Sequence, residues 1–196
     1  MVSPICLSVL ILEDQEADFV LVMRELRRAG FTVHCLRAES EAEFRLQLQG
    51  MPDIILTDYD LGPKFNAFRA LEVLQESGFD IPVIVLTGVV SEEPVVDCMR
   101  KGAADYLFKD RLMRLGPAVM RALKDSESRR EKRRAEEALQ NTRQHFQNLV
   151  ETTKVIPWEL NLETWQFTYV GPQAVTLLDI PWKYGAAKDS GTSTSI

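Results

Sequence analysis

Short apolar segments alternate with longer amphipathic segments between residues 7 and 108. The apolar segments are rich in Ile, Val and Leu and have the length of buried strands. They cover residues 7–12, 31–36, 52–57, 81–86 and 104–108. Strands that alternate with helices predict a parallel sheet that is covered by helices on both faces. We therefore expect an α/β fold with a doubly wound, five-stranded parallel sheet.

Capping residues mark the expected helix boundaries. Ser40 and Glu43 form a capping box at the start of the second helix, and Asn66 and Ser91 are expected to cap the third and fourth helices. Gly30 is expected to end the first helix. Apolar residues spaced three and four apart predict the buried faces of the first and fourth helices, which consist of Phe19, Val22, Met23 and Leu26, and of Val95, Cys98 and Met99.

Four of the predicted strands end in residues that carry charge or a hydroxyl group. Glu13 and Asp14 follow the first strand, Asp58 the third, Thr87 the fourth and Lys109 the fifth. In a doubly wound sheet, ligands bind in a crevice at the carboxyl ends of the strands. The sequence therefore predicts that these five side chains meet in one crevice.

The chemistry of this group favours a phosphoryl site. Carboxylates that converge in one crevice repel each other unless a cation lies among them, and Mg²⁺ with oxygen ligands is the natural choice. Lys109 would neutralise and Thr87 would hydrogen-bond the oxygens of a phosphoryl group, while Asp58 would be the nucleophile that forms an acyl phosphate. Each of these residues alone is more often a cap, a turn residue or a solvated strand end. Their coincidence favours the catalytic interpretation.

These residues, with Tyr106 three positions before Lys109 and the run of residues 102–106, resemble the receiver domain of two-component response regulators. The resemblance places a receiver at residues 1–124 and implies the strand order 2-1-3-4-5. It also implies that Asp58 accepts a phosphoryl group from a histidine kinase or a phosphotransfer protein. No turnover of a separate substrate is expected.

The resemblance further implies a role for each residue of the crevice. Mg²⁺ would be held by Glu13, Asp14, Asp58 and the backbone carbonyl of Asp60. Lys109 and Thr87 would contact the phosphoryl group, and Thr87 and Tyr106 would move together as a conformational switch.

Two departures from the receiver pattern lie beside the crevice. Receivers usually have proline after the lysine, whereas Asp110 follows Lys109 here. The loop after Asp58 is one residue longer than the common form, and Asn66 stands where glycine is usual. We therefore expect a different loop before the fifth helix. Neither departure removes a catalytic group, but with both of them the resemblance does not predict the lifetime of the phosphorylated state.

A long helix is expected to follow the receiver. Neither Pro nor Gly interrupts residues 117–150 after Pro117 itself, which suits the first turn of a helix. Within it, a 4-3-4-3 repeat predicts a coiled-coil seam made of Ala135, Leu139, Thr142, Phe146 and Leu149. We expect residues 125–150 to act as a signalling helix and helix 117–150 to form a parallel homodimer.

Residues 151–196 resemble the beginning of a PAS domain. Residues 158–162 and 165–170 predict two strands of a hairpin, and residues 171–175 predict a short helix. We expect a truncated PAS-like segment that ends in a polar tail, from which no ligand pocket can be argued. The output module is expected to be missing.

Composition excludes several other classes of protein. The net charge of −6 gives no support for binding to nucleic acid, and no apolar stretch approaches the length of a membrane span. Cys6, Cys35 and Cys98 show no metal-binding spacing, so we expect small core side chains in a reducing compartment. A cytoplasmic protein without membrane contact is expected.

Three other functions stay open as alternatives. A phosphorylation-independent dimerising adaptor would use the same surfaces without chemistry at Asp58. An aspartyl-phosphate phosphatase would also use Asp58 and Asp60, but that class carries its nucleophile on the first strand. A flavodoxin-like FMN carrier would need a phosphate loop after the first strand, where Glu13 and Asp14 would repel phosphate.

Overall fold

The computed structural model describes residues 5–62, 65–88, 92–152, 156–171 and 174. The chain divides into two compact units, Met1–Lys132 and Arg133–Ile196. Helix α5 (Leu115–Thr152) contributes residues to both units.

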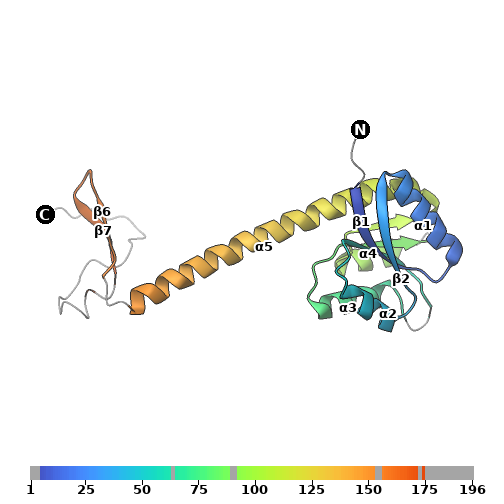
Figure 1. The fold of residues 1–196 in the computed structure, drawn as a ribbon, viewed down its shortest axis with the longest axis horizontal. Coiled ribbons are helices and arrows are strands. Elements are labelled where there is room, and N and C mark those ends of the chain that lie inside the picture. The colour runs from blue at the N-terminus through green and yellow to red at the C-terminus, as the bar shows by residue number, and fades with distance from the viewer. Residues whose placement is uncertain (1–4, 63–64, 89–91, 153–155, 172–173, 175–196) are drawn as a thin grey trace. The chain divides into compact units, whose positions relative to one another are not determined.

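The first unit contains a parallel sheet, in which β1 and β2 lie side by side (Figure 1), and its strand order β2-β1-β3-β4-β5 is the expected one. Its strands are β1 (Ile5–Leu12), β2 (Phe31–Ala38), β3 (Ile54–Asp58), β4 (Val83–Thr87) and β5 (Asp105–Phe108). Its helices are α1 (Glu16–Arg28), α2 (Glu41–Leu48), α3 (Ala67–Ser77), α4 (Glu92–Arg100), the 3₁₀ helix η1 (Lys109–Arg114) and the first part of α5 (Leu115–Thr152).

Two hydrophobic cores hold helices against opposite faces of this sheet. On one face, Val22 and Leu26 of α1 pack with Leu115 and Val119 of α5 against the sheet. On the other face, Phe44 of α2 and apolar residues of α3 and α4 form the second core. The sheet is therefore covered on both faces, which explains why its central strands are apolar on both sides.

The register of the strands brings their polar ends to one level. Leu12 pairs with Thr57, and Asp58 pairs with Leu86. Thr87 in turn pairs with Phe108, the residue before Lys109. Glu13, Asp58, Thr87 and Lys109 consequently leave neighbouring strands at the same edge of the sheet.

Two of the predicted caps are confirmed by hydrogen bonds. The Ser40 hydroxyl accepts a hydrogen bond from the Glu43 backbone N–H at 3.3 Å, and the Asn66 side chain accepts one from the Arg69 N–H at 3.0 Å. The Glu43 carboxylate accepts a hydrogen bond from the backbone N–H of Glu39. Ser91, the expected cap of α4, lies outside the described residues.

Three details of the prediction are wrong. Asp58 and Thr87 are the last residues of β3 and β4 and not the first residues after these strands, because their backbones still pair with β4 and β5. Met99 is exposed on α4, while Cys98 beside it is buried. Cys6 is exposed near the start of β1 and not a core residue, because the core begins at Leu7.

Helix α5 runs without interruption for 38 residues. It begins at Leu115, two residues before the expected start, so Pro117 falls in the first turn, where no intrahelical hydrogen bond is lost. Within the part of the chain that the structure describes, no helix is long and apolar enough to cross a membrane.

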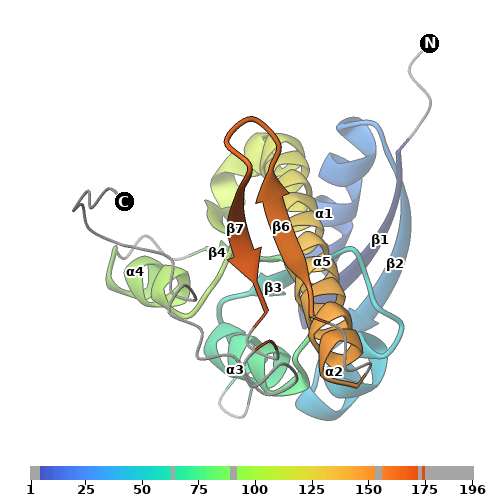
Figure 2. The same ribbon diagram turned by 90° about the vertical axis from the view of Figure 1, so that its left-hand side faces the viewer.

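The second unit contains an antiparallel hairpin of β6 (Trp158–Asn161) and β7 (Gln166–Val170), as the sequence predicts (Figure 2). The Asn161 side chain closes the turn by accepting hydrogen bonds from the N–H groups of Glu163 and Thr164. The Trp158 and Phe167 rings meet edge to face at 5.7 Å. Most of the short helix expected at residues 171–175 lies outside the described residues.

We predict that Gly116→Ala destabilises the first unit. Gly116, in the first turn of α5, faces Ala29 at the end of α1, and an added Cβ would stand 2.5 Å from the Cβ of Ala29. Replacing glycine by alanine in a helix normally stabilises by about 1 kcal/mol. Here the added methyl group would overpack the contact with Ala29. The free energy of unfolding, measured with urea, should therefore fall by about 1–3 kcal/mol instead of rising.

The double variant Ala29→Gly/Gly116→Ala is the matched control, because it removes the atom that the new methyl group would meet. It should recover part of the lost stability. A Gly116→Ala variant as stable as the wild type would show that the two helices move apart without cost.

Candidate functional site

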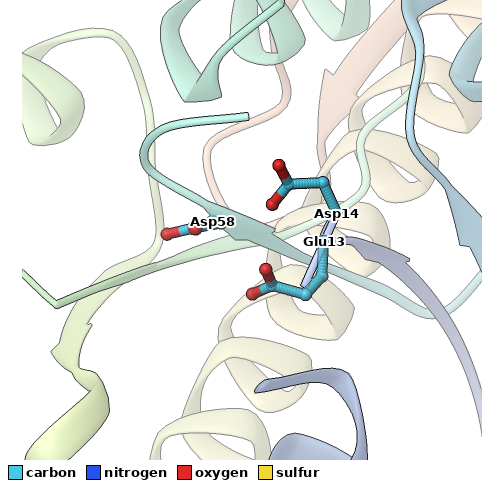
Figure 3. A group of neighbouring side chains, drawn as sticks. All are labelled: Glu13, Asp14 and Asp58. Carbon is cyan, nitrogen blue, oxygen red and sulfur yellow. The ribbon is translucent and has the colours of Figure 1, made fainter. Parts of the chain in front are cut away.

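The side chains predicted to form one crevice lie together at the carboxyl edge of the sheet. One carboxylate oxygen from each of Glu13, Asp14 and Asp58 lies within 4.8 Å of the other two. Figure 3 shows Glu13 and Asp14 at the end of β1, with Asp58 beside them on β3. Glu13 is buried, Asp58 is partly buried and Asp14 is exposed. The cluster therefore opens to solvent on the side of Asp14.

Lys109 is the positive counterpart of this cluster. Its ammonium donates hydrogen bonds to Glu13 Oε2 at 2.8 Å and to Asp58 Oδ2 at 3.0 Å. A third bond goes to Asp18 Oδ2 at 2.5 Å. An ammonium has three N–H donors, so these carboxylates occupy all of them.

Burial and ion pairing act against each other on the charges of the site. Desolvation raises the pKa of Asp58 above its ordinary value, and the hydrogen bond from Lys109 offsets only part of that rise. Glu13 behaves in the same way, with a raised pKa that is caused chiefly by burial. Burial disfavours the ammonium of Lys109, but its bonds to Asp18, Glu13 and Asp58 outweigh this and raise its pKa. The lysine therefore stays charged through the neutral range.

Thr87 and Tyr106 lie side by side at the edge of the same site. Thr87 is buried at the end of β4, and both residues line the same pocket. The Tyr106 ring packs edge to face on Phe108 at 5.5 Å. The pocket is lined by Asp18, Asp58, Tyr59, Asp60, Thr87, Gly88, Tyr106 and Lys109. Asp58 belongs both to this pocket and to the carboxylate cluster.

Asp60 lies in the same pocket, two residues beyond the end of β3. Its side chain is exposed and accepts a hydrogen bond from the Gly62 N–H at 3.1 Å. The expected role of Asp60, metal binding through its backbone carbonyl, stays a prediction.

Two residues of the site were not anticipated from the sequence. Asp18 belongs to the first turn of α1 and holds Lys109. Arg37, near the end of β2, donates hydrogen bonds to the backbone carbonyls of Glu13 and Asp14 and so supports the loop that carries them. A signal for Asp18 was present, because it precedes the buried Val22 and Leu26 by four and eight positions and so lies on their side of the helix.

The arrangement can perform two kinds of chemistry. The oxygen ligands of Glu13, Asp14 and Asp58 suit a hard divalent cation. Asp58 also lies on a rigid strand between an ammonium and a hydroxyl group, which could stabilise charge on a group bonded to its carboxylate.

Comparisons with known proteins identify a family for this chain. The response regulator receiver domain matches residues 9–118. The regulatory protein AtoC of Escherichia coli K12 is 28% identical over 132 residues, which cover 67% of this chain and 28% of AtoC. The transcriptional regulatory protein KdpE of Staphylococcus aureus is 31% identical over 102 residues, which cover 52% of this chain and 43% of KdpE. The chain thus spans less than half the length of these two relatives.

Solved structures agree with this assignment. The receiver domain of the response regulator NarL from Mycobacterium tuberculosis superposes with a TM-score of 0.55 at 21% identity, covering 62% of this chain and 98% of that one. At that identity the likeness shows the fold alone. The N-terminal domain of a response regulator/sensory box/GGDEF 3-domain protein from Carboxydothermus hydrogenoformans gives a TM-score of 0.53 at 25% identity, with the same coverage.

We predict that Asp58→Asn stabilises the fold at about pH 7 in the absence of divalent cations. A carboxyl group whose pKa is raised by folding ionises less readily in the folded than in the unfolded state, so its ionisation costs stability. That cost is present above the raised pKa and vanishes below the usual value of 3.8, where the group is protonated in both states. Urea unfolding should show a gain at neutral pH that shrinks as the pH falls.

Asparagine keeps an oxygen that can accept the Lys109 hydrogen bond, so the variant tests the charge and not the contact. Asp97→Asn, at an exposed position on α4, is the control and should show no comparable gain. If Asp58→Asn lowers the free energy of unfolding by the same amount at every pH, burial of the ionised Asp58 carboxylate does not cost stability.

Proposed function

Because this chain belongs to the response regulator receiver domain family, we propose that Asp58 accepts a phosphoryl group from a histidine kinase or a phosphotransfer protein. The observation that carries the proposal is the environment of Asp58. Its carboxylate stands at the end of a buried strand, 3.0 Å from the Lys109 ammonium and in one pocket with Thr87. These are the groups that transfer of a phosphoryl group requires.

In the proposed reaction, a carboxylate oxygen of Asp58 forms a bond to phosphorus while the bond from phosphorus to the donor breaks. The leaving group is the histidine imidazole of the donor protein, or acetate when acetyl phosphate is the donor. The product is an acyl phosphate on Asp58, and Lys109 would donate hydrogen bonds to its oxygens. Later hydrolysis of the acyl phosphate would restore the carboxylate, so no separate substrate would be turned over.

Glu13, Asp14 and Asp58 fit a Mg²⁺ ion by their chemistry and spacing. All three supply hard oxygen ligands from one small volume, and the exposed Asp14 leaves the site open to water, which Mg²⁺ retains. The Asp60 backbone carbonyl would complete the set of protein ligands. The ion would neutralise part of the charge that develops on the phosphoryl oxygens.

Thr87 and Tyr106 would convert phosphorylation into a change of conformation. Asp58, Thr87 and Tyr106 line one pocket, so the Thr87 hydroxyl would turn toward the oxygens of a phosphoryl group on Asp58. Tyr106 would then be free to change position beside Phe108. The two states would differ in population and not in fold.

We further propose that α5 carries this change to a partner module. Within the first unit, the side chains of Arg129 and Arg130 on α5 donate hydrogen bonds to Asp80, at 3.1 Å to its carboxylate and 2.7 Å to its carbonyl. Asp80 precedes β4, and β4 ends at Thr87. The helix is thus attached to the strand that carries the proposed switch.

The exposed seam of α5 supports dimerisation. Leu139 is 71% exposed and Phe146 is 58% exposed on this helix. Thr142, the polar member of the seam, donates its hydroxyl to the Ala138 carbonyl at 2.8 Å, so it can enter an apolar interface without an unpaired donor. A parallel pair of these helices would bury the seam and form a homodimer.

The hairpin would begin the module that receives the signal. Trp158, Phe167 and Tyr169 are exposed on β6 and β7, and a two-stranded hairpin is marginally stable by itself. A PAS-like sheet would supply further strands to cover these aromatic side chains. The solved chain from Carboxydothermus hydrogenoformans is the N-terminal domain of a response regulator/sensory box/GGDEF 3-domain protein, which gives such a multidomain arrangement a precedent.

We predict that the wild-type chain gains the mass of one phosphoryl group when it is incubated with Mg²⁺ and acetyl phosphate. Asp58→Asn should gain none, because an amide oxygen is a poor nucleophile, and removal of Mg²⁺ with EDTA should suppress uptake by the wild type. Intact-mass spectrometry measures all three. Asp97→Asn is the control and should be labelled like the wild type.

Labelling of Asp58→Asn to the same extent would contradict the assignment of the phosphorylated residue. No labelling of the folded wild type would favour the phosphorylation-independent adaptor. Steady turnover of p-nitrophenyl phosphate would favour a phosphatase.

We also predict that Leu139→Glu weakens dimerisation at least tenfold in sedimentation equilibrium, since two like charges would face each other across an apolar seam. Gln144→Glu, an exposed position outside the seam, adds the same charge to the same helix and should leave dimerisation unchanged. If both variants dimerise like the wild type, the seam is not the dimer contact.

A further inference from the structure

Asp18 is the acidic residue of the pocket to which the proposed reaction gives no role. It forms the shortest of the three bonds to the Lys109 ammonium, 2.5 Å, against 2.8 Å for Glu13 and 3.0 Å for Asp58. Its side chain comes from α1, whereas the other two carboxylates come from the ends of strands. Asp18 also lines the pocket that Asp58 and Thr87 share.

The three bonds leave Lys109 without a free donor for a phosphoryl oxygen. An incoming phosphoryl group can therefore engage the ammonium only if one carboxylate gives up its bond. The cost of giving it up depends on how well water can solvate the released carboxylate. Side-chain exposure is 1% for Glu13, 12% for Asp58 and 35% for Asp18, so Asp18 is released at the lowest cost.

We propose that Asp18 is a positioning residue that holds Lys109 toward α1 and competes with the phosphoryl group for its ammonium. This inference rests on the proposed function and adds a control of its rate. The Asp18 carboxylate also places a negative charge in the pocket that an anionic phosphoryl donor has to enter. Asp18 thus slows the capture of the phosphoryl group, and Lys109 exchanges Asp18 for the phosphoryl oxygens when capture succeeds.

A merely structural role for Asp18 makes a different prediction. An acidic residue in the first turn stabilises a helix through the helix dipole, and both Asp18 and Glu16 occupy that turn in α1. Glu16 pairs with Arg37 and not with Lys109. Loss of either charge would then affect stability alike and leave the rate of phosphorylation unchanged.

The test compares full-length Asp18→Asn with Glu16→Gln and Asp18→Glu. The second-order rate constant for phosphorylation is measured by intact mass over time with Mg²⁺ and acetyl phosphate, after thermal unfolding has shown that each variant folds. Asp18→Asn should react about three- to tenfold faster than the wild type, because one opposing charge is gone. Glu16→Gln should react at the wild-type rate, and Asp18→Glu, which restores the charge, should return close to that rate.

The outcomes distinguish a failure of this inference from a failure of the function on which it rests. Uptake by the wild type with an equal or slower rate in Asp18→Asn overturns the role of Asp18 and leaves Asp58 as the acceptor. Equal acceleration in Glu16→Gln also overturns it, because a general change of charge would then explain the effect. No uptake by the folded wild type overturns the proposed function and the inference together.

Discussion

One ammonium group shared by several carboxylates is the interaction on which the site depends. The register of β1, β3 and β5 brings Glu13, Asp58 and Lys109 to one level, so the sheet itself fixes their separation. Burial makes ionisation of both Glu13 and Asp58 costly, and Lys109 offsets only part of that cost. The unreacted pocket therefore holds more negative charge than it can neutralise. A divalent cation would relieve that imbalance, which links metal binding to the chemistry proposed for Asp58.

The fold could be predicted because the information lies in local patterns. Five apolar segments separated by amphipathic ones specify the alternating architecture, and the Ser40 and Asn66 caps begin their helices where expected. Strand ends were less predictable, because backbone pairing continues through Asp58 and Thr87 despite their polar side chains. The exposure of Met99 and Cys6 depends on which elements pack beside them, and the spacing of apolar residues in the sequence does not predict that.

The side chains of the site that follow the strands could be predicted from the sequence. A side chain that comes from a helix could not. Glu13, Asp14, Asp58, Thr87 and Lys109 could be found because parallel strands end at one edge. Asp18 and Arg37 could not be found by that rule, since Asp18 belongs to α1 and Arg37 reaches the site through the backbone carbonyls of Glu13 and Asp14. The position of Asp18 in line with Val22 and Leu26 would have placed it on the inner side of α1. Its contact with Lys109 still required the three-dimensional structure.

The central claim is that Asp58 carries the phosphoryl group while Lys109 and Thr87 bind its oxygens. The most direct measurement is a crystal structure of the full chain with Mg²⁺ and beryllium fluoride, which mimics a phosphoryl group. If Asp58 is the acceptor, we expect a beryllium fluoride group bonded to Asp58 and a metal ion among Glu13, Asp14 and Asp58. We also expect Lys109 in contact with fluoride. An unmodified Asp58 at saturating ligand, with Lys109 still bonded to all three carboxylates, would contradict it.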